Sequence, residues 1–286
     1  MSRILIAGCG DIGSALGVRL HADGHDVWGL RRSAQELPEG VQALQADLTK
    51  PDDLKRLPEG VDAVFYIVTP DAFDDRAYES VYVRGPENLL NAMAARGQPA
   101  RRMIFVSSTS VYGQSNGEWV DESSATQPEQ FSGRRLLEGE RLVLGGSERG
   151  LIVRFGGIYG RGANRLLQQV RNGNPCQESP PLYTNRIHRD DCVAVLRHLL
   201  TLSEPEQIYL GVDSDPATQC AVMDWLAKQL DVPIPPRSVA TAGRGDRART
   251  SKRCRNARLL ATGYRFLYPS FRDGYQAILA RKSGLS

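Results

Sequence analysis

The chain has 286 residues, of which 41% are hydrophobic and 24% are charged, and its formal net charge is +3. This length and apolar content predict a substantial core in one large domain or two interlocked domains. This net charge is too small to indicate nucleic-acid binding. An apolar strand begins within three residues of the N-terminus, which leaves no room for a signal peptide, and no apolar run reaches a membrane span of roughly 18 residues. We therefore expect a soluble, cytoplasmic protein.

Short apolar runs alternate with helical patterns through the first 160 residues. The pattern predicts strands over 3–8, 26–30, 41–46, 61–68, 101–108 and 151–159, and helices over 12–22, 74–96 and 132–149. Alternation of this kind is typical of βαβ units. We predict an α/β fold with a doubly wound parallel sheet of the Rossmann type and helices on both faces.

The pattern changes after residue 160. Helical periodicity covers roughly 163–172, 189–203 and 218–230, and 207–212 reads as the one firm strand. We interpret 1–160 as the main sheet domain. We interpret 161–286 as a small substrate cap mixed with sheet elements that return to the first domain.

The cysteines are odd in number and far apart: Cys9, Cys176, Cys192, Cys220 and Cys254. No C-x-x-C pair occurs, so the spacing favours reduced thiols over a disulfide framework or a zinc site. His21 and His25 have helix-like spacing, but Gly24 intervenes and no third ligand follows nearby. We predict no metal centre.

A glycine-rich segment, AGCGDIGSALG, joins the first strand to the first helix and supplies Gly8, Gly10 and Gly13. The first glycine permits a tight turn, the second lets the backbone approach a pyrophosphate, and the third packs the helix on the strand. The helix N-terminus then offers free N–H groups to the phosphate. In this strand–turn–helix context the motif predicts that 1–160 is a dinucleotide-binding domain.

The residue that meets the adenosine ribose lies at the end of the second strand, about 20 residues further on. An acid there would bind the 2′-hydroxyl of NAD, whereas this chain has Arg31 and Arg32. Two guanidinium groups suit a 2′-phosphate; the alternative is that both are solvated surface arginines. We predict NADP(H) as the cofactor, with NAD(H) as the alternative.

Three later segments match one family: SSTSVYG (107–113), RFGGIYGRG (154–162) and NRIHRDDCVAV (185–195). With the glycine loop, they resemble the extended short-chain dehydrogenase/reductase superfamily of the NAD(P)-dependent epimerase/dehydratase type, over essentially the whole length. The resemblance implies an enzyme in which Ser108 is the catalytic serine and the Asp47 carboxylate meets the adenine amine. The predicted cofactor site comprises Gly8, Gly10, Asp11, Ile12, Gly13, Arg31, Arg32, Asp47, Leu48, Thr69, Ser107 and Arg135.

The chain departs from the family at FSGRR, Phe131 to Arg135, where the family has Tyr-x-x-x-Lys. In the family the tyrosine exchanges the proton, and the lysine lowers its pKa and holds the nicotinamide ribose. Arg135 keeps a positive charge in the place of the lysine. Tyr112 is the nearest substitute donor in sequence, with Tyr82 and Tyr159 as others; alternatively, the Tyr112 hydroxyl only anchors the active-site loop.

Two functions therefore remain open. The first is an NADP(H)-dependent oxidoreductase or epimerase-like enzyme with an altered proton donor, acting on a small carbonyl or sugar-nucleotide-like substrate. Its catalytic residues would be Ser108, Tyr112 and Arg135. The second is a non-catalytic NADP(H)-binding regulator or redox sensor. Phe131 favours the second, whereas Ser108 and the full-length resemblance favour the first.

The basic tract 244–258 carries seven Lys/Arg against one Asp. It lacks interleaved aromatic residues, which argues against a nucleic-acid site. We expect a mobile lid that attracts an anionic substrate or closes over the cofactor; the alternative is a plain solvated surface. The predicted partner is a small molecule, with no nucleic acid and no membrane. A homodimer through the helices 74–96 and 132–149 is left open, because GRRLLEGER offers no clear apolar seam.

Overall fold

The computed structural model describes residues 1–33, 36–162, 165–239 and 250–282. The chain forms two compact units that interleave along the sequence: unit 1 comprises 1–111, 131–154 and 193–209, and unit 2 comprises 112–130, 155–192 and 210 onward. The chain thus passes between the units several times rather than once near residue 160. The segment 193–209, after unit 2 has begun, belongs again to unit 1.

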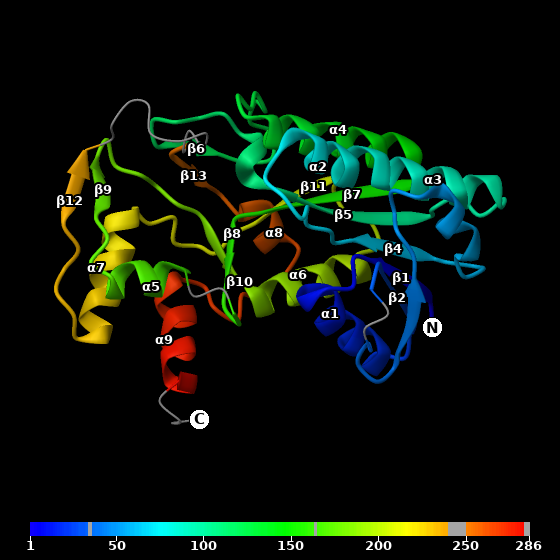
Figure 1. Ribbon diagram of the computed structural model, residues 1–286, viewed down its shortest axis with the longest axis horizontal. Coiled ribbons are helices and arrows are strands. Elements are labelled where there is room, and N and C mark those ends of the chain that lie inside the picture. Colours follow the sequence, from blue (N-terminus) through cyan, green and yellow to red (C-terminus); the bar gives the residue numbers. More distant parts are fainter. Residues whose placement is uncertain (34–35, 163–164, 240–249, 283–286) are drawn as a thin grey trace. The chain divides into compact units, whose positions relative to one another are not determined.

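A parallel sheet forms the centre of the fold, as Figure 1 shows. Among the described residues it has seven strands in the order β11-β7-β5-β4-β1-β2-β3, and the pairs β1–β2, β1–β4, β2–β3 and β4–β5 are parallel. The strands are β1 (Arg3–Ala7), β2 (Asp26–Arg31), β3 (Val41–Gln45), β4 (Ala63–Tyr66), β5 (Arg102–Ser108), β7 (Arg149–Phe155) and β11 (Ile208–Gly211). The central strands are apolar on both faces because helices cover both. The predicted doubly wound Rossmann-type sheet is confirmed.

Helices lie on both faces of this sheet (Figure 1). One face carries α1 (Asp11–Ala22) and α6 (Arg189–Thr201), and the other carries α2 (Asp75–Glu79), the π turn η2 (Ser80–Arg84), α3 (Gly85–Ala95) and α4 (Phe131–Gly146). Two short 3-10 helices, η1 (Pro51–Arg56) and η3 (Thr109–Val111), complete the connections. Within the described ranges, no helix is both long and apolar enough to cross a bilayer.

The helix predicted over 74–96 is interrupted by the π turn η2. The Tyr66 hydroxyl donates to Val81 O at 2.5 Å, which fixes this turn to β4. Gly139 of α4 packs so closely on the turn that a Cβ there would lie 2.2 Å from Tyr82 O. Helical periodicity alone does not reveal such a turn, and π turns frequently lie next to functional sites.

The strand predicted over 151–159 is divided at Gly156. A Cβ at Gly156 would lie 2.9 Å from Asn185 O, so the backbone there approaches a neighbouring loop closely. Past this point β8 (Gly157–Tyr159) pairs in parallel with β10 (Arg186–His188) in unit 2. Four more short strands, too short to be read from a pattern, pair as β6 (Glu118–Val120) with β13 (Lys252–Cys254) and β9 (Cys176–Ser179) with β12 (Arg237–Val239).

The remaining helices belong to unit 2: α5 (Arg165–Arg171), α7 (Gln219–Leu230), α8 (Ala257–Ala261) and α9 (Phe271–Lys282). Asp190 and Asp191 lie in the first turn of α6. Asp191 is fully buried and accepts from the Tyr264 hydroxyl at 2.8 Å, Leu267 N at 2.8 Å and Tyr268 N at 3.0 Å. This carboxylate therefore fixes the loop before α9.

The prediction of reduced thiols is wrong for two cysteines. Cys176 in β9 and Cys220 at the start of α7 form a disulfide across a sequence separation of 44 residues. The sequence spacing gives no sign of this pair, because only the packing of β9 against α7 brings the two sulfurs together. Cys9, Cys192 and Cys254 are free and buried, and burial raises the pKa of all three thiols.

Reduction of this disulfide is expected to destabilise the protein. A cross-link that closes a loop of this length typically stabilises a fold by about 2–4 kcal/mol. We expect Cys176→Ser with Cys220→Ser to lower the free energy of unfolding in urea by that amount. Thiol titration of the denatured, unreduced wild type should give three thiols from Cys9, Cys192 and Cys254; five thiols would contradict the pairing.

The prediction of a mobile basic lid is wrong for the half of the tract that the structure describes. Residues 244–249 lie outside the described residues. In 250–258, Lys252 belongs to β13, is only 4% exposed, and donates to Tyr112 O at 3.0 Å and Thr250 Oγ1 at 2.6 Å. Burial lowers the pKa of Lys252 to about 8. This segment is a packed part of unit 2.

Candidate functional site

The glycine loop lies between β1 and α1 in unit 1. Gly8 has a φ of +92°, and a Cβ there would lie 2.2 Å from Ile67 O, just after the neighbouring strand β4. A Cβ at Gly13 would lie 2.8 Å from Gly8 O. Contacts this short exclude any side chain, so the fold itself requires glycine at both positions.

Gly10 differs from these two glycines. Its φ is −83°, and nothing lies within 4 Å of the position that a Cβ would take. It directly precedes Asp11 and Ile12 in the first turn of α1, so open space adjoins the N-terminus of a helix. That is the space a pyrophosphate needs. The residues present therefore fit the diphosphate of a dinucleotide.

The arginine pair lies at the end of β2, next to the glycine loop. The two segments are joined by Gly8 N, which donates to Leu30 O at 3.0 Å. Arg31 is half-buried, and Arg32 is exposed but not free: it donates to both carboxylate oxygens of Asp71 at 2.6 and 2.7 Å. Asp71 raises the pKa of Arg32. Arg32 is thus an exposed cation whose guanidinium is oriented by Asp71.

The other predicted cofactor residues follow β3 and β4 at the same edge of the sheet. Asp47 Oδ1 accepts from Thr49 N at 2.9 Å and from the Thr49 hydroxyl at 2.7 Å. Leu48 is buried, and its carbonyl accepts from Asn88 Nδ2 at 3.0 Å. Thr69 is exposed. Because the carboxyl ends of parallel strands share one edge, these residues lie on the side of the sheet that carries the glycine loop.

A buried ionic group fixes the end of β5. Ser107 Oγ donates to Glu140 Oε1 at 2.6 Å, and Arg154 donates to the same carboxylate at 3.0 and 2.6 Å. All three side chains are almost completely buried. The Ser107 hydroxyl, predicted to meet the cofactor, is engaged with Glu140 here. The sequence carried no motif for this group, since its members come from three separate elements.

Ser108 is the last residue of β5 and is half-buried. Its Oγ accepts from Ser110 N at 3.2 Å. This bond uses an acceptor lone pair, so the hydroxyl hydrogen of Ser108 remains a donor for a substrate oxygen. The position and the bonding suit the role that the resemblance implies.

Phe131 begins α4, which puts FSGRR in the first turn of that helix. Its ring packs on Phe73 with centroids 5.0 Å apart and, edge to face, on Tyr78 at 5.3 Å. We refer to Phe73, Tyr78 and Phe131 as the aromatic group. Sequence reasoning did not single out Tyr78; its one available signal was the i, i+4 spacing to Tyr82, on which it also packs.

Arg135 is held between α2 and α4. Its Nε and Nη2 donate to the two oxygens of Asp75 at 2.8 and 2.9 Å, and its Nη1 donates to Glu138 at 2.9 Å. Asp75 and then Glu138 raise the pKa of Arg135, so the guanidinium stays charged. It supplies a fixed positive charge one turn after Phe131.

The three tyrosines proposed as donors from the sequence are all buried. Tyr82 lies in η2 of unit 1, whereas Tyr112 and Tyr159 belong to unit 2. Tyr112 is fully buried. The Tyr159 hydroxyl is buried without a hydrogen-bond partner among the described residues, and a Cβ at Gly274 would lie 2.0 Å from it. Burial raises the pKa of Tyr82 and Tyr159.

Comparison with known proteins decides the family. The sequence profile of the NAD dependent epimerase/dehydratase family matches residues 4–208, which is most of the chain. The chain belongs to this family. The prediction of an extended short-chain dehydrogenase/reductase-type enzyme with a nicotinamide dinucleotide cofactor is thereby confirmed.

Individual relatives extend over the whole chain. A solved Methylobacillus flagellatus protein assigned to the NAD-dependent epimerases/dehydratases is 39% identical, with a TM-score of 0.81 and 99% of each chain covered. The 3-diazoavenalumate denitrifying reductase of a Streptomyces species is 28% identical over 95% of this chain and 98% of its own length. Human epimerase family protein SDR39U1, solved with NADPH, shares the fold at 22% identity and a TM-score of 0.76, covering 96% of this chain and 98% of its own.

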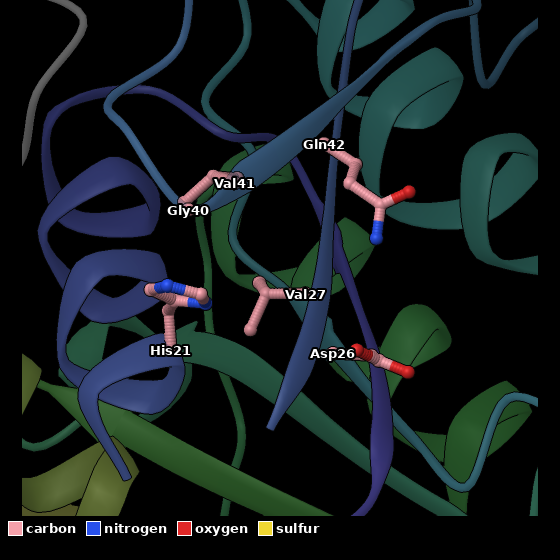
Figure 2. Close-up of a pocket in the computed structure, with 6 residues that line it drawn as sticks. All are labelled: His21, Asp26, Val27, Gly40, Val41 and Gln42. Atoms are coloured by element: carbon pink, nitrogen blue, oxygen red, sulfur yellow. The ribbon is translucent and has the colours of Figure 1, made fainter. Parts of the chain in front are cut away.

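Figure 2 shows a pocket lined by His21, Asp26, Val27, Gly40, Val41 and Gln42. Its residues come from the end of α1 and the first residues of β2 and β3. In the epimerase/dehydratase fold the cofactor loop follows the carboxyl end of β1, so this pocket lies at the opposite edge. We do not assign it to the cofactor. Across the described ranges, no group of three His, Cys, Asp or Glu side chains is placed to hold a metal ion.

Unit 2 of this epimerase/dehydratase contains a buried acid. Asp213 Oδ1 accepts from Asp215 N at 3.2 Å, while its Oδ2 is buried without a partner among the described residues. Burial raises the pKa of Asp213 to about 7, against the opposing effect of Arg186. An unfolded aspartate titrates near pH 4, so the folded protein binds more protons between about pH 4 and pH 7. Stability from this group is therefore lost as the pH rises through that window.

Asp213→Asn is expected to flatten this pH dependence. The amide keeps an acceptor for Asp215 N and carries no charge, so the variant should be more stable than wild type at pH 8 by about 2–4 kcal/mol. Urea unfolding at pH 5 and pH 8 measures the effect. Asp215→Asn, at an adjacent acid that pairs with Arg272 at 2.7 Å, is the control. An unchanged slope in Asp213→Asn would show that Asp213 does not titrate in this range.

Proposed function

We propose that this chain is an NADP(H)-dependent oxidoreductase acting on a small molecule, with a proton donor other than the residue at position 131. One observation carries the proposal. The glycine loop is closed to side chains at Gly8 and Gly13 and open at Gly10, and the oriented Arg32 follows the neighbouring strand of the same unit. A diphosphate beside the helix N-terminus and a 2′-phosphate beside the arginine pair match this arrangement.

The arginine pair supports NADP(H) over NAD(H). The family is named for NAD, and the human neighbour was solved with NADPH, so the fold itself allows either cofactor. Arg31 and Arg32 place two positive charges where an NAD-binding chain needs an acid. A guanidinium donates two parallel hydrogen bonds to a phosphate, which a ribose hydroxyl cannot accept equally well.

The chain's own residues divide the remaining work. When bound, the nicotinamide supplies or accepts the hydride. Ser108 donates to the substrate oxygen, and Arg135 places a positive charge beside the nicotinamide ribose. Tyr112, the donor that the sequence favours, is fully buried, whereas Tyr78 is half-buried and packs on Phe131. Either hydroxyl is a candidate for the proton that Phe131 does not provide.

We expect a small carbonyl or sugar-nucleotide-like substrate. The Streptomyces relative suggests a further class, because it is named for denitrifying a diazo compound. Hydride addition to an arenediazonium ion releases N₂ and leaves a C–H bond on the ring, and no proton has to reach an oxygen. Such an electrophile suits a site in which Phe131 occupies the usual position of the proton donor.

The aromatic group supports one alternative. If the space beside Phe131 is closed by Phe73 and Tyr78, the chain would bind NADP(H) and report its level without turnover. Ser108 has no evident role in such a sensor. We therefore rank the enzyme first.

Deuterium transfer tests the proposal. Wild type and Ser108→Ala are incubated with NADPH deuterated at C4 and with an aldehyde, a ketone, a sugar nucleotide and an arenediazonium salt. We expect label in at least one product, and loss of one oxygen-polarising donor should slow carbonyl reduction by about 100-fold without changing NADPH affinity. Tight NADPH binding with no label in any product would favour the sensor. Tyr78→Phe and Tyr112→Phe then identify the donor.

A further inference from the structure

The contact between Arg32 and Asp71 joins two segments of unit 1, one after β2 and one after β4. Arg32 directly follows β2, and Asp71 lies in the loop between β4 and α2. Nη1 donates to Oδ2 at 2.6 Å and Nη2 donates to Oδ1 at 2.7 Å, so both ends of the guanidinium fork are engaged. The backbone is held as well, because Gln45 Nε2 donates to Arg32 O at 3.2 Å.

A carboxylate and a phosphate use the same face of a guanidinium. Each offers two oxygens at a spacing that accepts the parallel N–H groups of the fork. Asp71 therefore occupies the position that a 2′-phosphate would take on Arg32. Both side chains are well exposed, at 61% and 70%, so an incoming anion can reach the pair from solvent.

We propose that Asp71 is a specificity-determining residue, which competes with the 2′-phosphate of NADP(H) for Arg32 and thereby sets how strongly the chain discriminates against NAD(H). The inference rests on the proposed function, because it requires Arg32 to bind the 2′-phosphate. Asp71 orients the guanidinium while no phosphate is bound. When the 2′-phosphate binds, Asp71 releases the guanidinium of Arg32 to this more highly charged acceptor. The Asp71 carboxylate stays nearby, and its negative charge repels the phosphate.

The expected effect is modest, because exposed ion pairs are weak. Displacing such a pair changes an equilibrium by about two- to fivefold. Asp71→Asn also removes the repulsion between the carboxylate and the phosphate, so we expect the 2′-phosphate to bind about three- to tenfold more tightly at low salt. The gain should shrink as the ionic strength rises, since salt screens exposed charges.

Calorimetric titration tests this with two probes, adenosine 2′,5′-bisphosphate and 5′-AMP, which differ by the 2′-phosphate. The variants are Asp71→Asn, Arg32→Gln and the double variant. Asp52→Asn is the matched control, because Asp52 is likewise an exposed acid in an ion pair, with Lys55 at 2.7 Å in η1. We expect Asp71→Asn to tighten the bisphosphate and not 5′-AMP, and to have a clearly smaller effect once Arg32 is glutamine, because only the repulsion between carboxylate and phosphate is then relieved.

The other outcomes overturn either the competition by Asp71 alone or also the binding of the 2′-phosphate by Arg32. If Arg32→Gln weakens the bisphosphate but Asp71→Asn leaves it unchanged or weaker, the competition is overturned and the NADP(H) assignment stands. If Asp52→Asn tightens the bisphosphate equally, or Asp71→Asn acts equally without Arg32, the effect is general charge and the competition is again overturned. If Arg32→Gln has no effect, Arg32 does not hold the 2′-phosphate, and both the competition and this part of the proposed function are overturned.

Discussion

Phe131→Tyr is expected to raise NADPH-dependent reduction of a small carbonyl by at least about tenfold. In the proposed alignment the change places a phenol where the family has its proton donor, and a positioned general acid contributes roughly 10²–10⁴-fold in rate. Arg135 lies one helical turn further on, and its positive charge favours the ionised form of a phenol at position 131 and so lowers the pKa of that phenol. Its guanidinium is already held by Asp75 and Glu138, which is why we expect less than the full factor.

Phe73→Tyr is the matched control for this variant. It adds the same hydroxyl to another ring of the aromatic group, whose centroid is 5.0 Å from that of Phe131. We expect no gain in kcat/KM from it. The measurement is the initial rate of NADPH oxidation with an aldehyde, together with NADPH affinity. If Phe131→Tyr binds NADPH normally and is no faster than wild type, position 131 is not where the proton is needed.

Gly10→Ala is expected to weaken NADPH binding by about 10–100-fold while the fold stays intact. The added methyl group meets no protein atom within 4 Å, and the φ of −83° is negative, so alanine avoids the left-handed strain that it would meet at Gly8. The methyl group instead fills the space that the diphosphate requires. Loss of one or two hydrogen bonds to a charged group, at about 1.5–3 kcal/mol each, gives this factor.

Gly8→Ala should behave differently, and the contrast makes the test sharp. Its Cβ would lie 2.2 Å from Ile67 O at a φ of +92°, so we expect a loss of stability of about 3 kcal/mol or more. Thermal unfolding and NADPH titration of both variants separate the two effects. Normal NADPH affinity in a folded Gly10→Ala protein would show that the diphosphate does not lie beside α1.

Local sequence was sufficient to predict the sheet and the glycine loop. The strands β1 and β4 are short apolar runs that end at turns, and burial on both faces demands that composition. The glycine positions were predictable for a related reason. Gly8 and Gly13 leave no room for a side chain, so the sequence must have glycine at both positions, and this gives the recognisable spacing. Arg31 and Arg32 were predicted as cofactor residues because the same local pattern places them at the end of β2.

Contacts between distant segments were not predictable in this way. Arg32 meets Asp71, 39 residues on, and Glu140 of α4 meets Arg154 of β7. The disulfide between Cys176 and Cys220 likewise depends on how unit 2 packs. Each pair consists of common residue types without a shared motif, so only the tertiary fold identifies them.

For Phe131, the sequence predicted one part of what the structure shows and missed another. The sequence identified it as a departure from the family, because the spacing from Ser108 and the helical pattern after it are retained. It did not reveal that Phe73 and Tyr78 pack on the same ring, since both come from the segment between β4 and η2. The half-buried Tyr78 was therefore missed as a candidate donor, whereas the buried Tyr112 was favoured by its closeness in sequence.

The proposed function depends first on NADP(H) binding through the glycine loop and the arginine pair. The most direct test is the ratio of the dissociation constants of NADPH and NADH for wild type, measured at one fixed ionic strength. Two charge-assisted contacts to the 2′-phosphate predict that NADPH binds at least about tenfold more tightly. Equal binding, or tighter binding of NADH, would contradict the account.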